Sequence, residues 1–217
     1  GRVLAELRAR GQLEDTLVVY AGDNGFAFGE QGLIDKRTPY EVSMRIPLLV
    51  QCPGAIKPGT VVKSVVANID FAPTILQAAG IKETLPNIDG RSFWPLLLGE
   101  SIPWRNEVLY EYFWERNYPQ TPTLHAVRGE RYKYIRVHGL WDIDEFYDLA
   151  TDPGETRNLI FEPEYQELIK GYNHKLFDLL AKSNGASMPL RPDSGIIGNL
   201  RRASGSPPAS FPPELTR

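Results

Sequence analysis

The sequence predicts an α/β fold followed by a small α+β subdomain with an antiparallel sheet and one packed helix. Three patterns support this prediction. Residues 1–11 have apolar residues at helical spacing and lead into the apolar run 17–21, which is typical of a buried strand in a parallel sheet. Beyond residue 105, short segments rich in aromatic and β-branched residues predict the antiparallel sheet. After Pro163, apolar residues repeat along one face of a long helix.

The elements of the first hundred residues follow from their boundary residues. Gly11 is expected to end the first helix in a left-handed conformation, and residues 46–50 form a second short apolar run. Asp70 is expected to cap a helix over residues 71–79, which ends before Gly80. Because this helix is apolar nearly all round, we expect it to be buried.

The second half of the chain predicts a sheet covered by one helix. A shift in composition over residues 99–105 indicates a domain boundary. The strands predicted beyond it are residues 108–114, 124–128, 132–137 and 145–149. The helix after Pro163 is expected to pack across this sheet through Tyr165, Leu168, Ile169, Tyr172, Leu176, Leu179 and Leu180. From residue 183 the chain is rich in Pro, Gly and Ser, which predicts an extended tail.

Charge and composition argue against several classes of function. The net charge is only -3 over 217 residues and no block of Lys and Arg occurs, so neither a nucleic-acid partner nor a membrane-surface patch is expected. No apolar run reaches about 18 residues, so no membrane span is expected. The single cysteine, Cys52, excludes an internal disulfide, and we expect it to pack as a small apolar residue.

Polar residues follow the first apolar run at the point where the predicted strand ends. Asp23 and Asn24 lie side by side between Gly22 and Gly25. Ligands of open α/β sheets bind at the carboxyl ends of strands, and two hard oxygen donors on a tight turn suit a calcium or magnesium ion. The same residues are also a common turn sequence, so both interpretations stay open. Lys36 follows Asp23 by thirteen positions, and a metal with a lysine can hold a tetrahedral anion.

Together with the segment around Asp23, further short sequence motifs occur in order over roughly residues 1–160. They are residues 22–25, 29–33, 35–41, 45–48, 68–76, 89–92, 132–135, 145–149 and 152–159. In this order they closely resemble the sulfatase family of the alkaline-phosphatase-like superfamily. The resemblance implies that residues 1–103 are the C-terminal portion of the catalytic α/β domain, an alkaline-phosphatase-like sandwich. It implies a C-terminal α+β subdomain over residues 104–182, before the extended tail 183–217.

The resemblance also implies a site and a reaction. Asp23 and Asn24 are expected to be ligands of Ca²⁺, with Mg²⁺ as an alternative, and Lys36 is expected to be catalytic by binding a sulfate oxygen. The family hydrolyses sulfate esters with a formylglycine made from the Cys or Ser of a Cys/Ser-x-Pro-x-Arg motif. The partner implied is a sulfated small molecule or carbohydrate. Many relatives are exported, so the resemblance favours a periplasmic or extracellular location.

The nucleophile motif does not occur in this sequence. Cys52 is followed directly by Pro53 with no arginine at the motif's offset, and the segment that begins at Ser206 has Ser210 where arginine belongs. The paired acidic ligands of the family's first strand are also absent. The chain therefore resembles the C-terminal part of a sulfatase, and we expect it to be inactive without the N-terminal portion of the same protein. Two alternatives stay open, a phosphodiesterase or phosphonate hydrolase of the same superfamily and a non-catalytic binding module.

Other polar residues are secondary candidates for contact with a substrate. Gln31 stands where many relatives carry histidine, which removes a titratable group from that segment. Structural roles are expected for Arg91, His125 and His138, and His174 is expected on the solvated face of the last helix. An ion-pair set is expected to hold the loop around Lys36, namely Arg37, Glu41 and Arg45.

Overall fold

The computed structural model describes residues 1–81, 86–138, 142–183, 185, 187–190 and 206–210. These residues form two compact units. The first unit contains the described residues of Gly1–Asn24 and Arg45–Asn106, and the second contains the described residues of Gly25–Met44 and Glu107–Arg217. The expected division after residue 103 keeps the segment Gly25–Met44 in the first portion, whereas its contacts group that segment with the second unit.

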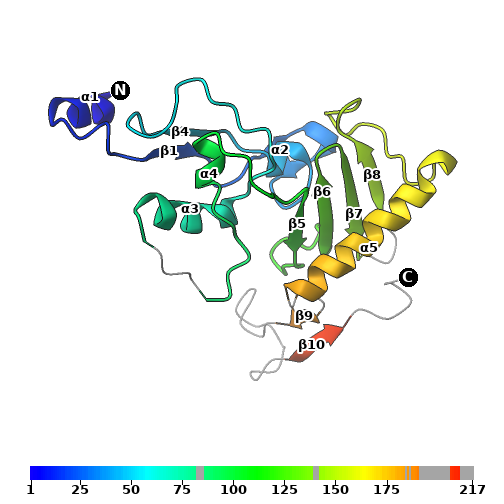
Figure 1. The fold of residues 1–217 in the computed structure, drawn as a ribbon. Coiled ribbons are helices and arrows are strands. Elements are labelled where there is room, and N and C mark those ends of the chain that lie inside the picture. Colours follow the sequence, from blue (N-terminus) through cyan, green and yellow to red (C-terminus); the bar gives the residue numbers. More distant parts are fainter. Residues whose placement is uncertain (82–85, 139–141, 184, 186, 191–205, 211–217) are drawn as a thin grey trace. The chain divides into compact units, whose positions relative to one another are not determined.

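The first unit contains an antiparallel strand pair. β1 (Val18–Ala21) pairs with β4 (Leu48–Gln51) (Figure 1). The expectation of a fully buried strand in a parallel sheet is therefore wrong for this chain. Tyr20 and Leu49 lie opposite each other and are 65% and 67% exposed, because only the other face of this two-stranded sheet packs on a core.

Three helices accompany this strand pair. α1 (Arg2–Ala9) precedes β1, and Gly11 beyond it has the expected left-handed φ of 67°. α3 (Phe71–Ala78) and α4 (Trp94–Leu97) contribute to the apolar core. The buried residues of that core are Cys52, Ile56, Phe93 and Leu97, which confirms the packing expected for the cysteine. Ile75 of α3 is 50% exposed, so the prediction of a helix buried all round is wrong.

Asp70 is the polar centre of the first unit. It is fully buried at the end of a 3-10 helix, η2 (Asn68–Asp70). Its carboxylate accepts hydrogen bonds from the N–H groups of Ala67 and Arg91, each at 2.8 Å, and pairs with the guanidinium of Arg105. Although Asp70 precedes α3 as expected, its side chain makes no cap bond to that helix, so the predicted capping contact is wrong. The carboxylate instead joins three segments of the chain.

Four antiparallel strands form the sheet of the second unit (Figure 1). Their order is β5 (Glu107–Tyr112), β6 (Leu124–Gly129), β7 (Tyr132–Val137) and β8 (Glu145–Asp148). All four predicted strands are confirmed, and the largest difference is at the end of the first, expected at residue 114 and observed at Tyr112. Tyr134 lies at the middle of the sheet, opposite Val127 on one side and Phe146 on the other.

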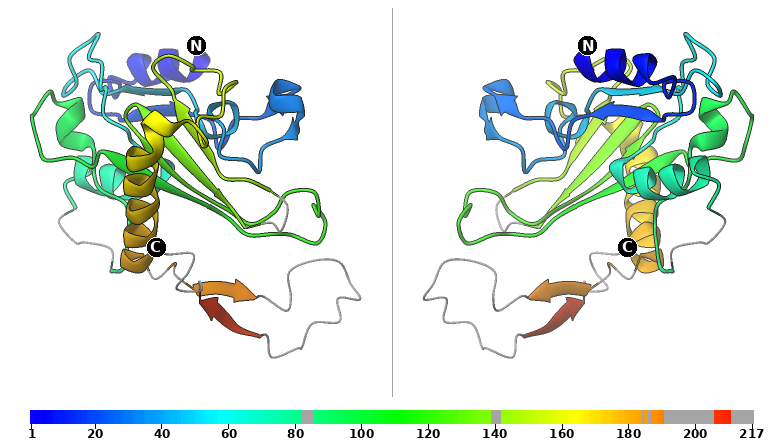
Figure 2. Two further views of the ribbon diagram at one scale, coloured as in Figure 1. Left: turned by 90° about the vertical axis from the view of Figure 1, so that its right-hand side faces the viewer. Right: turned by 90° about the vertical axis from the view of Figure 1, so that its left-hand side faces the viewer.

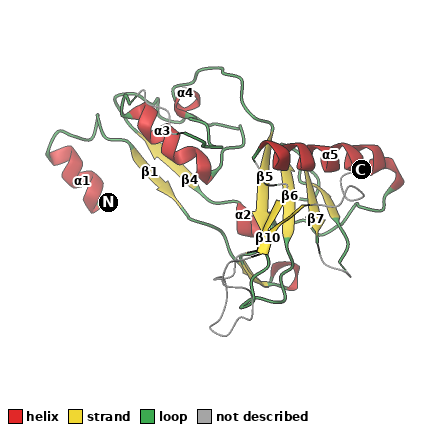
Figure 3. Ribbon diagram, turned by 90° about the horizontal axis from the view of Figure 1, so that it is seen from below, coloured by secondary structure: helices red, strands yellow, loops and turns green. Residues whose placement is uncertain are grey.

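One long helix packs on this sheet. α5 (Gln166–Lys182) runs along one face of the strands, as Figures 2 and 3 show, and Pro163 begins the 3-10 helix η3 (Pro163–Tyr165) that leads into it. The buried core between helix and sheet consists of Val127, Tyr134, Phe146, Leu159, Ile169, Tyr172, Leu176 and Leu180. The opposite face of the sheet carries a second cluster, Leu124, Ala126, Ile135 and Tyr147, against which Tyr40 packs. The predicted helix on an antiparallel sheet is therefore confirmed.

Short elements complete the second unit. β2 (Ala27–Phe28) pairs antiparallel with β3 (Ile34–Asp35), and α2 (Glu41–Met44) follows. In the predicted tail, β9 (Ser187–Leu190) and β10 (Ser206–Ser210) pair antiparallel, and residues 184, 186, 191–205 and 211–217 lie outside the described residues. Within the ranges that the structure describes, no helix is long and apolar enough to cross a membrane.

Candidate functional site

Asp23 and Asn24 lie exposed in the loop that follows β1. The N–H of Asn24 donates to Asp23 Oδ1 at 2.9 Å, a local bond of the kind that stabilises Asp-containing turns. A carboxylate and an amide are also the hard oxygen donors that Ca²⁺ and Mg²⁺ prefer, so the chemistry of the pair fits such an ion. The described residues contain no group of three or more His, Cys, Asp or Glu that could hold a metal. A bound ion would therefore need further ligands.

Lys36 directly follows β3 and is exposed. Its backbone N–H donates to Asp35 Oδ1 at 2.7 Å, which fixes the main chain at the point where the lysine side chain leaves it. Asp23 and Asn24 belong to the first unit and Lys36 to the second. A pocket common to these three residues therefore stays a prediction.

Two charged residues flank Lys36 and pair with each other. Arg37 Nη1 lies 2.7 Å from Asp35 Oδ1, and the Thr121 hydroxyl donates to Asp35 Oδ2 at 3.3 Å. The guanidinium of Arg37 lies over the Tyr118 ring, with Cζ 3.2 Å from the ring centroid. Burial alone would raise the pKa of Asp35, but the N–H of Lys36 and the Arg37 guanidinium outweigh it and hold that pKa below its usual range. Asp35 is therefore ionised at neutral pH.

A buried lysine on β7 joins α2 and the residues before it to the sheet. The Lys133 side chain has no exposed surface, and its ammonium donates to the Pro39 carbonyl oxygen at 2.7 Å. The same ammonium lies 2.8 Å from Glu41 Oε1 and 2.7 Å from Glu155 Oε1. Arg128 on β6 donates to both carboxylate oxygens of Glu41, at 3.2 and 3.1 Å. Two carboxylates and two cations thus balance their charges in this cluster.

The two carboxylates beside Lys133 respond differently to their surroundings. Burial would raise the pKa of Glu41, but hydrogen bonds from Arg128 and the charge of Lys133 lower it to about 2. For Glu155, burial outweighs the attraction of Lys133, and the nearby Glu41 charge adds to it, so the pKa of Glu155 is raised. Glu155 is therefore the carboxylate of this cluster that takes up a proton first when the pH falls.

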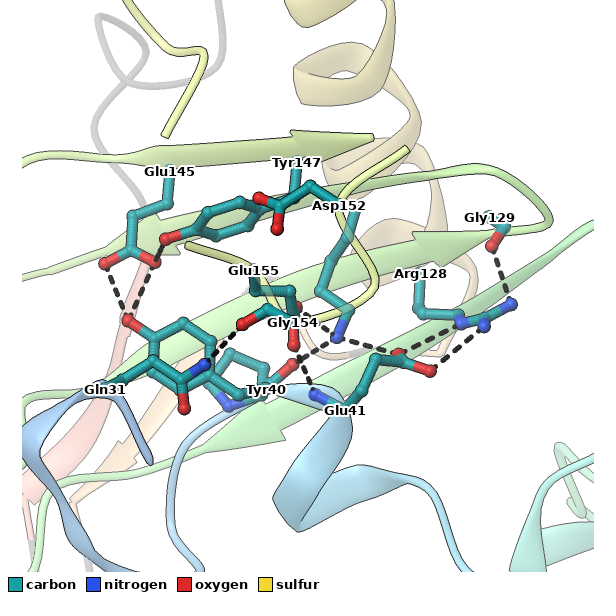
Figure 4. A network of polar contacts seen from close by, with 12 residues as sticks. Gln31, Tyr40, Glu41, Arg128, Gly129, Glu145, Tyr147, Asp152, Gly154 and Glu155 are labelled. Atoms are coloured by element: carbon teal, nitrogen blue, oxygen red, sulfur yellow. Dashed lines mark hydrogen bonds and ion pairs between the residues drawn. The ribbon is translucent and has the colours of Figure 1, made fainter. Parts of the chain in front are cut away.

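Two further contacts hold the segment around Lys36. The Tyr40 hydroxyl lies 3.0 and 2.9 Å from the two carboxylate oxygens of Glu145, to which it donates (Figure 4). Gln31 adopts a left-handed φ of 50°, and its Nε2 donates to the Gly154 carbonyl oxygen at 2.7 Å. The Gln31 side-chain amide thus contacts the turn that follows β8 within the second unit.

Two residues of the expected ion-pair set around Lys36 pair with other residues than predicted, so that prediction is wrong. Arg37 pairs with Asp35, and Glu41 pairs with Arg128 and with the buried lysine of β7. Arg45 belongs to the first unit, whereas Arg37 and Glu41 belong to the second. Both of the latter residues do hold the segment, as expected, but the contacts of Glu41 come from strands far along the chain.

The histidines of the sheet have structural roles, as expected. His125 is fully buried on β6, and its Nδ1 lies 2.9 Å from His138 Nε2. Glu111 Oε1 lies 3.5 Å from the other ring nitrogen of His125. Burial, together with His125 and Arg136, lowers the pKa of His138 to about 4, so this ring is neutral at pH 7. His174 is exposed on α5, also as expected.

Three residues of the site were not predicted from the sequence, namely Lys133, Glu155 and Tyr118. A signal existed for the first two, because both lie in segments that carry the family resemblance, residues 132–135 and 152–159. A lysine in a strand rich in aromatic and β-branched residues also requires a partner where the strand is buried. Tyr118 lies in a polar loop, where no local pattern marks it.

The sequence of this chain matches a known family. A family model described as N-sulphoglucosamine sulphohydrolase, C-terminal, matches residues 29–182. The chain therefore belongs to the sulfatase family and represents its C-terminal portion.

Similar proteins include sulfatases of bacteria and mammals. The chain is 37% identical over 171 residues to an N-acetylglucosamine-6-O-sulfatase of Bacteroides thetaiotaomicron, which covers 76% of this chain and 30% of that protein. It is 33% identical over 210 residues to the N-acetylglucosamine-6-sulfatase of Homo sapiens, with 82% and 37% of the two chains covered. The chain thus spans about a third of the length of these relatives.

Solved structures similar to this chain include a complex with a sulfated sugar and a phosphonate hydrolase. A protein in complex with its substrate D-glucosamine-2-N,6-O-disulfate matches with a TM-score of 0.79 and 34% identity, covering 85% of this chain and 38% of that one. The phosphonate monoester hydrolase of Agrobacterium radiobacter matches with a TM-score of 0.71 and 26% identity, covering 98% and 42% of the two chains. The alkaline-phosphatase-like fold expected from the sequence is thereby confirmed.

Proposed function

We propose that the chain is the C-terminal part of an enzyme that hydrolyses sulfate esters, with 6-O-sulfated glucosamine derivatives as its substrates. The observation that carries this proposal is the family match over residues 29–182, which includes Lys36 and the contacts that hold it. The substrate class is supported by the names of two relatives, both N-acetylglucosamine 6-sulfatases, and by the disulfated glucosamine bound in a similar structure.

In this proposal Lys36 binds an oxygen of the sulfate group. Lys36 is an exposed residue, and its positive charge would offset the negative charge that develops on the sulfate oxygens as sulfur is attacked. Because the adjacent arginine is paired with Asp35 and covered by Tyr118, the lysine is the cation of this tripeptide that faces solvent. Lys36 thereby combines anion binding with transition-state stabilisation.

Asp23 and Asn24 would hold a Ca²⁺ ion, or alternatively Mg²⁺, as two of its oxygen ligands. When bound, such an ion supplies positive charge that polarises the sulfate. The neutral Asn24 beside the anionic Asp23 keeps the loop less negative, which favours the approach of an anionic substrate. The formylglycine nucleophile and the remaining metal ligands are expected from the N-terminal portion of the protein.

The test uses the complete protein that contains this chain. N-acetylglucosamine 6-sulfate should be hydrolysed, and Lys36→Ala should lower kcat by roughly 10²–10³-fold, the loss expected for one oxyanion donor. Lys170→Ala is the matched control, because Lys170 is an exposed lysine of α5 that pairs with a neighbouring glutamate on the same helix. An unchanged kcat in Lys36→Ala would exclude the proposed role of the lysine.

The second candidate is a phosphonate or phosphate ester hydrolase of the same superfamily. It is favoured by the similarity to a phosphonate monoester hydrolase over 98% of this chain. A metal and a lysine can hold phosphoryl and sulfuryl groups alike. Paired aryl sulfate, aryl phosphate and phosphonate monoester substrates separate the two functions, since a sulfatase should show its highest kcat/KM on the sulfate. A complete protein that hydrolyses neither these compounds nor N-acetylglucosamine 6-sulfate would favour the non-catalytic binding module.

A further inference from the structure

Lys36 is held on both sides by one loop of the sheet. This loop connects β5 to β6 over residues 113–123. On one side of Lys36, the Thr121 hydroxyl donates to Asp35 Oδ2 at 3.3 Å. On the other side, Tyr118 lies under the Arg37 guanidinium at 3.2 Å. The lysine therefore leaves the main chain between two residues that touch the same loop.

The loop has internal hydrogen bonds that keep these contacts in place. The N–H of Tyr118 donates to the Glu115 carbonyl oxygen at 3.0 Å, and the N–H of Thr121 donates to the Tyr118 carbonyl oxygen at 3.2 Å. At the base of the loop, the N–H of Trp114 donates to the Thr123 hydroxyl oxygen at 3.0 Å. Thr121 and Asp35 are both buried, so water competes little for the bond between them.

The Tyr118 ring also packs against the charged group of Arg37. The guanidinium has Asp35 Oδ1 at 2.7 Å, Glu115 Oε1 at 3.5 Å and the ring face beneath it. Arginine is well suited to stacking on an aromatic face while it pairs with a carboxylate. The Arg37 guanidinium thus contacts two carboxylates and an aromatic ring, whereas the neighbouring Lys36 is an exposed residue.

We propose that Tyr118 is a positioning residue for Lys36, acting through the stacked Arg37 guanidinium. The inference rests on the proposed role of Lys36 in binding sulfate. The backbone position of Lys36 sets the region that the ammonium at the end of its long side chain can reach. Misplacing a binding group by about 1 Å can cost on the order of 10²-fold in rate. Tyr118 therefore contributes to catalysis although it contacts Arg37 rather than the substrate.

The experiment compares two substitutions of Tyr118 in the complete enzyme. Tyr118→Phe keeps the ring face and should leave kcat within about twofold. Tyr118→Leu removes the ring and should lower kcat by roughly 10–100-fold, by the effect of misplacement on rate. An equal kcat for the leucine variant and the wild-type enzyme would overturn the proposal.

The same substitutions are then made in a Lys36→Ala background. If Tyr118 acts through Lys36, Tyr118→Leu should cause no further loss of kcat there. An equal loss with and without Lys36 would mean a general structural role and would overturn the inference. Arg37→Lys, which keeps the positive charge but removes the planar group that stacks on Tyr118, gives a second test of the same contact with the same expected pattern should the leucine variant not fold.

Failure of the inference can be told apart from failure of the proposed function. If Lys36→Ala itself leaves kcat unchanged, the proposed role of Lys36 is wrong. If Lys36→Ala is slow but Tyr118→Leu is as fast as the wild-type enzyme, only the positioning role is wrong.

Discussion

Lys133 Nζ lies 2.7 Å from Glu155 Oε1, and both side chains are almost fully buried. The pair joins β7 to the turn that follows β8, and Glu41 and the Pro39 carbonyl oxygen complete the surroundings of the ammonium. A buried charge of this kind is stable only while its partners stay in place. Because Glu41 and Pro39 belong to the segment that carries Lys36, the stability of the sheet depends on that segment.

Replacing Lys133 by methionine should strongly destabilise the second unit. Breaking a buried ion pair by removing one partner costs about 3–5 kcal/mol, because the remaining carboxylates stay buried without a cation. Urea unfolding followed by circular dichroism measures the loss as a lower midpoint. Lys170→Met is the matched control, since Lys170 and Glu167 are both exposed, and it should change stability by less than about 1 kcal/mol. Equal midpoints for the two variants would contradict a structural role for the buried pair.

Two glycine substitutions should have opposite effects on stability. A Cβ at Gly90 would lie 1.9 Å from the Ile69 carbonyl oxygen, so Gly90→Ala must displace backbone beside Asp70 and should cost about 2 kcal/mol or more. Gly171 lies on the exposed face of α5 with nothing within 4 Å of an added Cβ. Gly171→Ala should therefore stabilise by roughly 1 kcal/mol, the helix preference of alanine over glycine. Urea midpoints measure both, and a stabilising Gly90→Ala would refute the close approach.

His138 should make the protein less stable in mild acid. Its pKa is lowered from 6.5 to about 4 by burial, His125 and Arg136. Between these two pH values the unfolded chain binds more protons than the folded chain, so this contribution to stability is complete above pH 6.5 and is lost as the pH falls toward 4.

The measurement is the free energy of unfolding in urea across that pH range. In His138→Gln, whose side chain does not titrate, the decline with falling pH should be shallower than in the wild-type chain. An equal slope for both proteins would show that His138 is not the group responsible.

Removing the Asp23 carboxylate should lower the metal content of the complete protein. Asp23→Ala loses a charged ligand, whereas Asn24→Asp keeps an oxygen donor at its position and should retain the ion. Mass-spectrometric determination of calcium and magnesium after dialysis measures the difference. Asp178→Ala, at an exposed position of α5, is the control for a general change of charge. Unchanged metal content in Asp23→Ala would exclude this residue as a ligand.

Local patterns in the sequence were sufficient to predict the sheet strands and the long helix of the second unit. The strands, the helix after Pro163 and its apolar face depend on hydrophobic spacing within a few residues, and such spacing can be read directly. Pro163 and Gly11 mark helix ends because their backbone preferences are intrinsic to the residue type. The order of the motifs was also enough to identify the family, and it placed Lys36 in the chain as the candidate anion-binding cation.

Only the tertiary structure decided which residues meet. β1 looks like a parallel strand by composition, but its partner in this chain is an antiparallel strand about thirty residues later. Lys133 donates to a carbonyl 94 positions away, and Tyr118 stacks on an arginine from another part of the chain. Buried charges and strand edges are satisfied by whatever the fold brings within hydrogen-bonding distance, and no local spacing encodes that distance. The family and the elements therefore follow from the sequence, whereas the contacts that hold Lys36 in place follow from the packing of distant segments.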